Sequence, residues 1–236
     1  MNYLKKILPV AVIAVLALSA CSVKNEVPWV SLFDGKTLDG WNKKNGEAQY
    51  YVEEGAIVGK ATLNTPNTFL CTNELYSDFI FEFDVIVEGK LNSGVQFRSN
   101  SFPDHKDGRV HGYQSEIDPS PRRWTAGIYD EGRRGWLNPL DGNPLARSAY
   151  KEQQWNNVRI EAIGDTIKTF LNGVIASHLI DGKTAKGFFG LQVHGIGNNK
   201  ALDGTTIKWK NIRIVTDNPQ KYATKAEFPA IRSKKD

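Results

Sequence analysis

The amino-acid sequence predicts an all-β fold, an antiparallel β-sandwich built from many short strands. Apolar and polar residues alternate with period two in one segment after another, and Gly, Asn, Asp and Pro separate these segments. Helical periodicity of any length is missing. A chain of 236 residues, 40% of them hydrophobic, can build a full core. Sheet-on-sheet packing needs one apolar face per strand, so the other face is free for function.

The first element along the chain is a secretory targeting segment. Lys5 and Lys6 precede an apolar run over residues 7–18, which has the length of a signal-peptide core and is too short to span a bilayer. The run leads into Leu-Ser-Ala-Cys, which ends at Cys21 and resembles the bacterial lipobox. We therefore expect acylated Cys21 to anchor the chain in the lipid bilayer of the bacterial cell envelope, at the periplasmic or outer-membrane surface. The alternative is a plain signal peptide with an incidental cysteine.

The rest of the chain reads as one domain. We expect a signal peptide at 1–20, a tether at 21–28, a jelly-roll domain at 29–216 and a C-terminal tail at 217–236, because no Pro/Ser-rich linker interrupts the β pattern. Cys71 is then the one thiol left beside the acylated cysteine. It is expected to be a buried apolar residue, and the core must hold without an intramolecular disulfide.

The clearest strand runs from Phe79 to Val87, where Phe and Val alternate with Glu82 and Asp84. Asn172-Gly173 is the signature of a two-residue type I′ turn, which predicts a hairpin between its flanking strands. The further strands that the alternation predicts are 95–98, 113–118, 158–163, 167–171, 174–180, 188–194 and 207–215.

Charge and motifs exclude several function classes. The net charge is +4, but Lys5, Lys6 and the basic tail account for it, so the folded body is near neutral. A nucleic-acid partner is not expected, since it needs a concentrated basic surface. The sequence has no phosphate-binding loop, no dinucleotide fingerprint and no Gly-x-Ser-x-Gly elbow, so nucleotide chemistry and serine hydrolysis are unsupported.

Three of the predicted strands, 95–98, 113–118 and 188–194, carry unusual polar side chains on the face opposite their apolar face. If these strands are neighbours, the side chains form one polar floor on which Glu116 and Asp118 lie about 7 Å apart along their strand. The alternative is a solvated face with ion pairs between Arg98 and the acids. The residues of this expected floor are Gln96, Arg98, Gln114, Glu116, Asp118, Gln192 and His194.

The segment 119–136 is long, irregular and rich in aromatic and Arg residues. Loops on a rigid sandwich often bind ligands, and aromatic faces beside planar guanidinium groups suit sugar rings. We therefore expect Trp124, Tyr129, Arg133 and Trp136 to contact a carbohydrate. The alternative is that the two Trp residues close the end of the core.

A metal site has weaker support. His105 and His111, with His194, Glu116 and Asp118, could ligate a divalent cation, but no compact ligand spacing supports such a site. No cofactor is expected.

A series of short motifs follows the chain from Trp29 to about Val215. The motifs are Leu-Phe-Asp-Gly-Lys-Thr-Leu-Asp-Gly-Trp at 32–41, Asn-Ser-Gly at 92–94, Phe97-Arg98, Gly112-Tyr113, Glu-Ile-Asp at 116–118, Gly-Ile-Tyr at 127–129, Trp155-Asn156, Leu-Asn-Gly at 171–173, Gly-Leu-Gln-Val-His at 190–194 and Lys-Asn-Ile-Arg at 210–213. Together and in this order they resemble the 3-keto-disaccharide hydrolase family. The resemblance implies a concanavalin A-like jelly roll that acts on glycosides already oxidised to a ketone at C3. The reaction would be 1,2-elimination to a 3-keto-2-hydroxyglucal, or hydration of that product, which together amount to hydrolysis.

This chemistry assigns roles to the polar floor. A C3 ketone acidifies the C2 proton, which a base removes if the enolate oxygen is stabilised. We expect His194 to be the base, Glu116 an alternative base or leaving-group acid, and Arg98 the oxyanion partner. Asp118 would orient whichever of them it touches. Gln96, Gln114 and Gln192 would hold hydroxyl groups of the oxidised glycoside.

Two other functions compete with this assignment. The first is a noncatalytic carbohydrate-binding lipoprotein, which predicts sugar binding without turnover. The second is a conventional glycoside hydrolase, because Glu116 and Asp118 match the start of a Glu-x-Asp-x-x-Glu strand motif. Pro121 stands at the place of the second Glu, so that mechanism lacks its proton donor.

Overall fold

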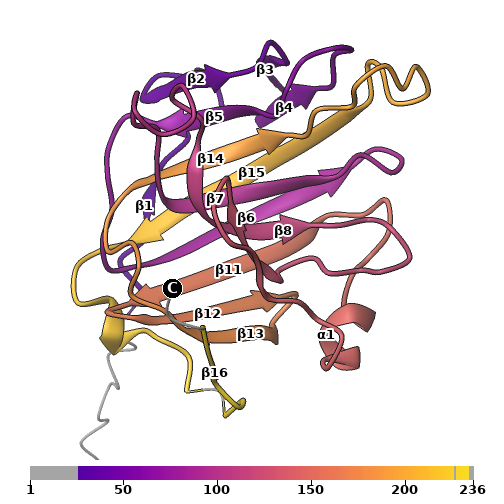
Figure 1. The fold of residues 1–236 in the computed structure, drawn as a ribbon. Helices are drawn as coiled ribbons and strands as arrows, with labels where there is room; N and C mark the ends of the chain where they lie inside the picture. Colours follow the sequence, from indigo (N-terminus) through magenta and orange to yellow (C-terminus); the bar gives the residue numbers. More distant parts are fainter. Residues whose placement is uncertain (1–25, 226, 234–236) are drawn as a thin grey trace, which may run out of the picture.

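The computed structural model describes residues 26–225 and 227–233, which form two β-sheets packed face to face (Figure 1). The predicted signal peptide and Cys21 lie outside the described residues. Within the described ranges, no helix has both the length and the apolar character needed to cross a membrane.

One sheet has nine strands. All its pairs are antiparallel except the terminal pair, in which β16 from the C-terminal segment lies parallel to β13. The strands in spatial order are β16 (Ile231–Arg232), β13 (Val174–Ile180), β12 (Thr166–Leu171), β11 (Asn156–Ile163), β6 (Phe79–Val87), β15 (Thr206–Val215), β4 (Ala56–Lys60) and β3 (Gln49–Glu53), and β1 (Val30–Ser31) pairs with β15.

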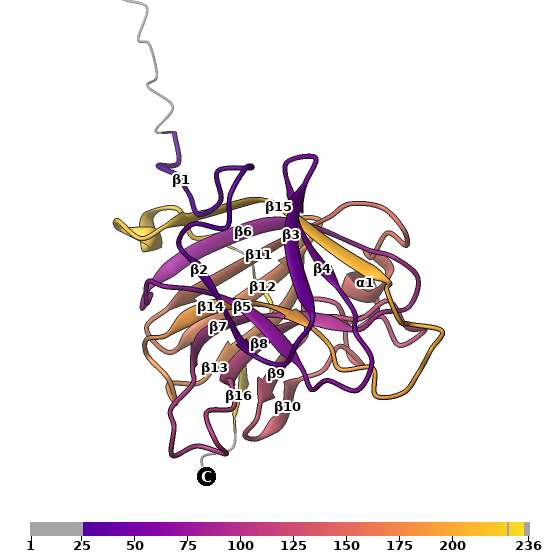
Figure 2. The same ribbon diagram turned by 90° about the horizontal axis from the view of Figure 1, so that it is seen from above.

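The second sheet has seven antiparallel strands, and Figure 2 shows β8, β9 and β10 following one another toward one of its edges. Two short helices, α1 (Pro144–Ser148) and η1 (Pro219–Lys221), lie outside the sheets. The predicted antiparallel sandwich is confirmed. The strands in spatial order are β10 (Gly135–Asn138), β9 (Ile128–Glu131), β8 (His111–Ile117), β7 (Ser93–Asn100), β14 (Phe188–Val193), β5 (Thr68–Thr72) and β2 (Trp41–Asn45).

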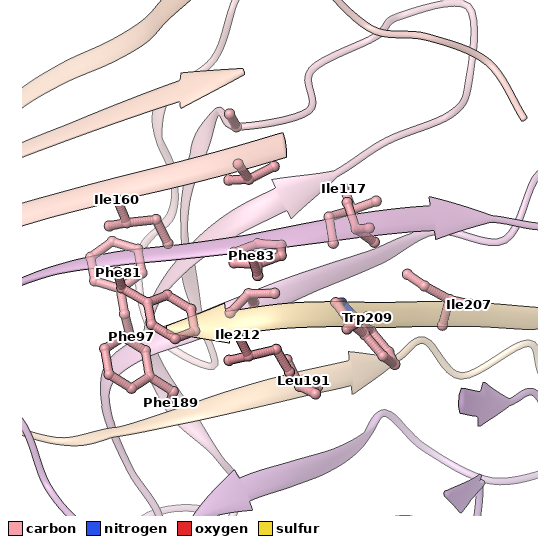
Figure 3. Close-up of a cluster of buried hydrophobic side chains, with 14 of the residues drawn as sticks. Phe81, Phe83, Phe97, Ile117, Ile160, Phe189, Leu191, Ile207, Trp209 and Ile212 are labelled. Carbon is pink, nitrogen blue, oxygen red and sulfur yellow. The ribbon is translucent and has the colours of Figure 1, made fainter. Parts of the chain in front are cut away.

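Aromatic side chains join the two sheets. Phe81 of the nine-stranded sheet stacks on Phe189 of the seven-stranded sheet with ring centroids 4.0 Å apart, and Trp209 lies fully buried farther along the same core (Figure 3). In each strand, the apolar residues at alternate positions point into this interior. The polar alternate positions of the seven-stranded sheet therefore face outward, where the candidate site lies.

Two local predictions are also confirmed. Asn172 and Gly173 have φ values of 49° and 81°, as a type I′ turn requires, and they join β12 to β13 as a hairpin. Cys71 is a buried free thiol whose pKa is raised by burial, as expected of an unreactive core residue.

Candidate active site

The strands that carry the predicted polar floor are neighbours. Strand β8 pairs with β7, and β7 pairs with β14, so Gln114 and Glu116 lie on the same outer face as Gln192. A cavity of about 380 Å³ opens on this face. The described residues that line the cavity are Asn67, Asn92, Arg109, Gln114, Glu116, Arg122, Tyr129, Glu131, Trp136, Gln192 and His194.

A glycine lets the floor form. Gln114 lies across Gly94 of the central strand β7, where a Cβ atom would come within 2.4 Å of the Gln114 Cδ. Gln114 Oε1 accepts hydrogen bonds from the Nε2 groups of Gln96 and Gln192. Because its oxygen is taken by these two donors, Gln114 must turn its Nε2 toward Glu116, and it donates to Oε2 over 2.8 Å.

Glu116 is a buried carboxyl with a shifted pKa. It is 5% exposed, and its other oxygen accepts a hydrogen bond from Asn92 Nδ2 over 2.8 Å. Burial raises the pKa of Glu116 to about 7, although the hydrogen bonds from Asn92 and Gln114 act in the opposite direction. A carboxyl of this kind changes charge near neutral pH, which suits proton transfer to and from a substrate.

His194 lies directly after β14 and is exposed at the rim of the cavity. Its Nδ1 lies 2.8 Å from the carbonyl oxygen of Gly195. Because a carbonyl oxygen only accepts, this contact places a proton on Nδ1 and leaves Nε2 available. The imidazole can therefore accept or donate a proton at Nε2.

Arg122 is one of two arginines that line the cavity, and the other, Arg109, is paired with Glu131. Its Nε donates to Asp118 Oδ2 over 2.8 Å, and its guanidinium lies 4.4 Å from the ring centroid of Trp124 and 5.2 Å from that of Trp136. Within the described part of the chain, no acceptor meets its two terminal nitrogens. Arg122 is thus held in place with two donors free.

Asp118 holds the loop that carries Arg122. It also accepts hydrogen bonds from the backbone N–H groups of Ser120 and Trp124. Burial raises the pKa of Asp118, but hydrogen bonds from Ser120 and Arg122 outweigh burial and leave the pKa below its ordinary value. Asp118 is therefore a fixed anion that positions Arg122.

A second carboxylate, Glu131, lies far along the sheet from Glu116. It forms a 2.6 Å ion pair with Arg109 and is paired in register with Gly112, four residues before Glu116. Four residues of antiparallel strand span about 13 Å. Both carboxylates line the cavity, and Glu131 is the one held in an ion pair.

The structure brings together six of the predicted site residues, namely Glu116, Gln114, Gln192, His194, Tyr129 and Trp136. Trp124 does not line the cavity. It packs edge-on against Trp136, with ring centroids 4.7 Å apart, and against the core. Asp118, which accepts a hydrogen bond from the Trp124 N–H, does not line the cavity either and acts through Arg122.

The prediction that Arg98 faces the floor is wrong. A bulge inserts an extra residue in β7 between Phe97 and Asn100, and Arg98 itself has a φ of 45°. The alternation therefore breaks, and the guanidinium turns to Asp78 and to the carbonyl oxygens of Ser77 and Gly164. Arg98 holds the end of the sandwich together instead.

Two other substrate contacts predicted from the sequence are also wrong. Gln96 is on the expected face but is fully buried beneath Gln114, where it accepts a hydrogen bond from Ser99. Arg133 turns away from the cavity and donates to Asp130 and Thr184. Neither side chain is available to a sugar.

Five residues of the cavity were not predicted as site residues: Asn67, Asn92, Arg109, Arg122 and Glu131. Asn92 belongs to a motif that carries the family resemblance, and Arg122 lies in the aromatic- and Arg-rich segment 119–136, so both had a signal in the sequence. Glu131 lies in that same segment, whereas Asn67 and Arg109 come from irregular segments without alternation and had no such signal. Among the described residues, no group of three or more His, Cys, Asp or Glu side chains lies together as a metal site would require.

Residues 28–215 match the 3-keto-alpha-glucoside-1,2-lyase-like domain. Among curated proteins, none matches this chain.

Solved structures share the fold. A protein from Parabacteroides distasonis ATCC 8503, provisionally described as a glycosyl hydrolase, superposes with a TM-score of 0.57 at 16% identity, over 80% of this chain and 93% of its own. A second protein from the same organism, described in the same way, superposes with a TM-score of 0.54 at 22% identity, over 80% of this chain and 98% of its own. Carbohydrate binding module CBM66 from Bacillus subtilis superposes with a TM-score of 0.51 at 21% identity, over 73% of this chain and 93% of its own. The fold is shared with all three, and the sequence match shows that this chain belongs to the 3-keto-alpha-glucoside-1,2-lyase-like domain family.

Proposed function

We propose that the protein cleaves 3-keto-glycosides by 1,2-elimination and hydrates the 3-keto-2-hydroxyglucal that results, so that the sum is hydrolysis. One observation supports this most: a buried carboxyl, Glu116, has a pKa of about 7 in a polar cavity that also holds a cation and an imidazole. The family membership points to the same class of substrate.

Glu116 is the base in this proposal, and His194 is not, which reverses the order expected from the sequence. The C3 ketone makes the C2 proton acidic, and the Glu116 carboxylate takes it. The electron pair of the C–H bond moves onto the C3 oxygen as an enolate. Arg122, with two free donors, stabilises that oxygen in place of Arg98.

His194 acts on the leaving group. When the enolate returns its electron pair, the C1=C2 double bond forms, the C3 ketone is restored and the C1–O bond breaks. The departing oxygen takes a proton from Nε2 of His194 in its imidazolium form, which leaves a neutral imidazole whose remaining proton is on Nδ1. Hydration runs through the same groups, with water adding at C1 and a proton returning to C2.

Amide groups at the floor suit the sugar hydroxyls. Gln192 Oε1 is buried and has no hydrogen-bond donor among the described residues, so a substrate hydroxyl would satisfy it. Tyr129 and Trp136 pack edge to face beside it with ring centroids 5.2 Å apart and offer an apolar wall.

The experiment is turnover of a 3-keto-glucoside by a soluble form that starts at residue 22. Enone absorbance and free aglycone report the reaction, and Glu116→Gln should lower kcat by about 10² to 10⁴. Saturable sugar binding without turnover would instead establish a noncatalytic module. Cleavage of glycosides that carry no ketone would establish a conventional hydrolase.

We also propose that the reaction takes place at the bacterial cell envelope, with acylated Cys21 holding the domain at a lipid bilayer. The proposal is supported by the lipobox-like sequence that ends at Cys21. The substrate is then an extracytoplasmic glycoside that another enzyme has oxidised.

A further inference from the structure

The chain enters the folded domain on the outer face of the nine-stranded sheet. The Trp29 ring centroid lies 4.4 Å from the Arg213 guanidinium and 5.8 Å from that of Arg159. In β15 and β11 the residues on either side of these arginines are buried in the core, so both guanidinium groups lie on the outer face. Trp29 lies against them and marks the place where the chain arrives at the domain.

This arrival point is held by backbone and side-chain contacts. Residues 30–31 form β1, which pairs with β15 in the sheet. Glu82 fixes the guanidinium against which Trp29 packs, with 2.7 Å between its Oε1 and Arg213 Nη2. The cation against the aromatic ring adds to these contacts. The tether predicted at residues 21–28 therefore ends at a fixed point of the domain.

The candidate active site lies on the opposite side of the molecule. Its cavity is on the outer face of the seven-stranded sheet, where Tyr129 and Glu131 of β9 and Trp136 of β10 line it. Figure 2 shows β1 at one side of the molecule and β9 and β10 at the other. The two sheets pack about 10 Å apart and carry side chains on both outer faces, so the full thickness of the sandwich separates Trp29 from the cavity.

We propose that the outer face of the nine-stranded sheet around Trp29 faces the lipid bilayer that holds acylated Cys21, and that the candidate cavity opens away from this bilayer. The inference rests on the lipid anchor in the proposed function. The substrate is then a water-soluble glycoside that reaches the cavity from the aqueous side. A glycolipid of the leaflet that holds the anchor is not accessible to the cavity.

The tether is too short for the opposite orientation. The eight residues at 21–28 span at most about 26 to 29 Å when fully extended. A domain of about 200 residues is roughly 40 Å across. To lay the far side of such a domain on the bilayer, a tether would have to follow a quarter of the circumference and then one radius, which is about 50 Å. The cavity therefore cannot turn onto the surface that holds the anchor.

The charges near Trp29 favour no particular lipid. Ion pairs join Glu82 to Arg213 and to Arg159, and Arg159 also pairs with Glu161. Two arginines and two glutamates thus offset one another beside the end of the tether. Anionic lipids attract clusters of uncompensated basic residues, so the position of the tether, and not lipid charge, decides which face meets the bilayer.

The test places a fluorescent thiol label on either side of the acylated protein, bound to phosphatidylcholine vesicles whose headgroups carry a nitroxide quencher. Val30→Cys puts the label beside Trp29, since Val30 is 57% exposed. Asp104→Cys is the matched variant on the cavity side, because Asp104 is exposed on the β7–β8 loop that brings Arg109 to the cavity. Cys71 is buried and does not compete for the label.

The label at residue 30 should lose most of its fluorescence to the quencher, and the label at residue 104 should lose little. A second pair of proteins carries about 20 additional Gly and Ser residues in the tether, which then spans more than the required 50 Å or so. The domain can turn over on this longer tether, so the losses at the two positions should become similar.

The outcomes separate this orientation from the anchor and from the elimination. Equal losses at the two positions with the natural tether, or a larger loss at residue 104, would overturn the orientation while the anchor and the elimination stand. A difference that persists with the longer tether would overturn the tether as its cause. If the protein does not bind the vesicles at all, the anchor and this inference fall together and the elimination is unaffected.

Discussion

Gln114 donates a hydrogen bond from Nε2 to the Glu116 carboxylate over 2.8 Å, and it has no freedom to do otherwise because two neighbouring glutamines occupy its oxygen. The amides thus form a fixed chain that ends on the proposed base. This chain holds the carboxylate in one orientation and lowers a pKa that burial has raised.

The first prediction concerns pH. Glu116 must be ionised to act as a base, so kcat/KM should fall as the pH drops through about 7, the pKa of Glu116. Gln114→Met removes a hydrogen bond that lowers this pKa, and the acidic limb should move to higher pH. The pH profiles of kcat/KM for the two proteins measure the shift. A limb that stays at the same pH in Gln114→Met would argue against Glu116 as the titrating base.

The second prediction concerns stability. The pKa of Glu116 is raised from 4.5 to about 7, so the folded protein keeps this proton while the unfolded chain loses it. Its contribution to stability is therefore fully present below pH 4.5 and is lost as the pH rises through 7. Glu116→Gln avoids that loss and should raise the free energy of unfolding at pH 8 by up to about 3 kcal/mol.

Urea unfolding at two pH values measures this difference. At pH 4 the Glu116→Gln and wild-type proteins should have similar free energies of unfolding, since Glu116 is then protonated in both states. A variant that is less stable than wild type at pH 8 would show that the carboxylate is well paired in the folded protein and does not suffer from burial.

The third prediction separates the two arginines. Arg122→Leu should lower kcat by about 10² to 10³, the loss typical of one oxyanion donor. The buried Asp118 then loses an ion pair but keeps the N–H donors of Ser120 and Trp124, so the variant should stay folded at the assay temperature. Arg98→Leu should do the reverse. It leaves the carbonyl oxygens of Ser77 and Gly164 without their donor and should cost about 1 to 3 kcal/mol of stability while kcat stays close to wild type.

Thermal unfolding and turnover of a 3-keto-glucoside, measured on both arginine variants, make the comparison. If Arg98→Leu loses turnover at a temperature where it is still folded, the bulge in β7 does not remove Arg98 from the chemistry. In that case the assignment of Arg122 would have to be withdrawn.

The fourth prediction concerns the lipid anchor. Replacing Cys21 with Ser removes the thiol that would be acylated, and each buried methylene of an acyl chain contributes about 0.8 kcal/mol to membrane binding. The Cys21→Ser protein should therefore leave the membrane pellet and appear in the soluble fraction. The same amount of protein in the pellet after this change would exclude a Cys21 anchor.

The sequence was sufficient to predict the fold and about half of the residues at the site. The residues that it did not predict correctly were missed for physical reasons. Strict alternation along β8 and β14 places Glu116, Gln114 and Gln192 on the outer face, and the structure has them there. Alternation fails at Arg98, where one inserted residue reverses the faces, and no local residue pattern announces that bulge.

Burial is the second reason why the sequence did not predict every residue of the site. Parity places Gln96 on the same face as Gln114, but it does not say that Gln114 will cover Gly94 and seal Gln96 below. Arg122 and Arg133 lie on either side of β9, and only tertiary contacts decide that one enters the cavity and the other pairs with Asp130. Such choices depend on partners that are distant in sequence.

The central claim is that Glu116 removes the C2 proton and His194 protonates the leaving group, and proton exchange in D₂O tests it most directly. Wild-type protein and two variants are incubated with a 3-keto-glucoside while NMR follows the C2 proton and free aglycone. His194→Gln should exchange the C2 proton while releasing aglycone about 10² to 10⁴ times more slowly than wild type. Glu116→Gln should neither exchange this proton nor release aglycone. Exchange at the wild-type rate in Glu116→Gln would show that Glu116 is not the base.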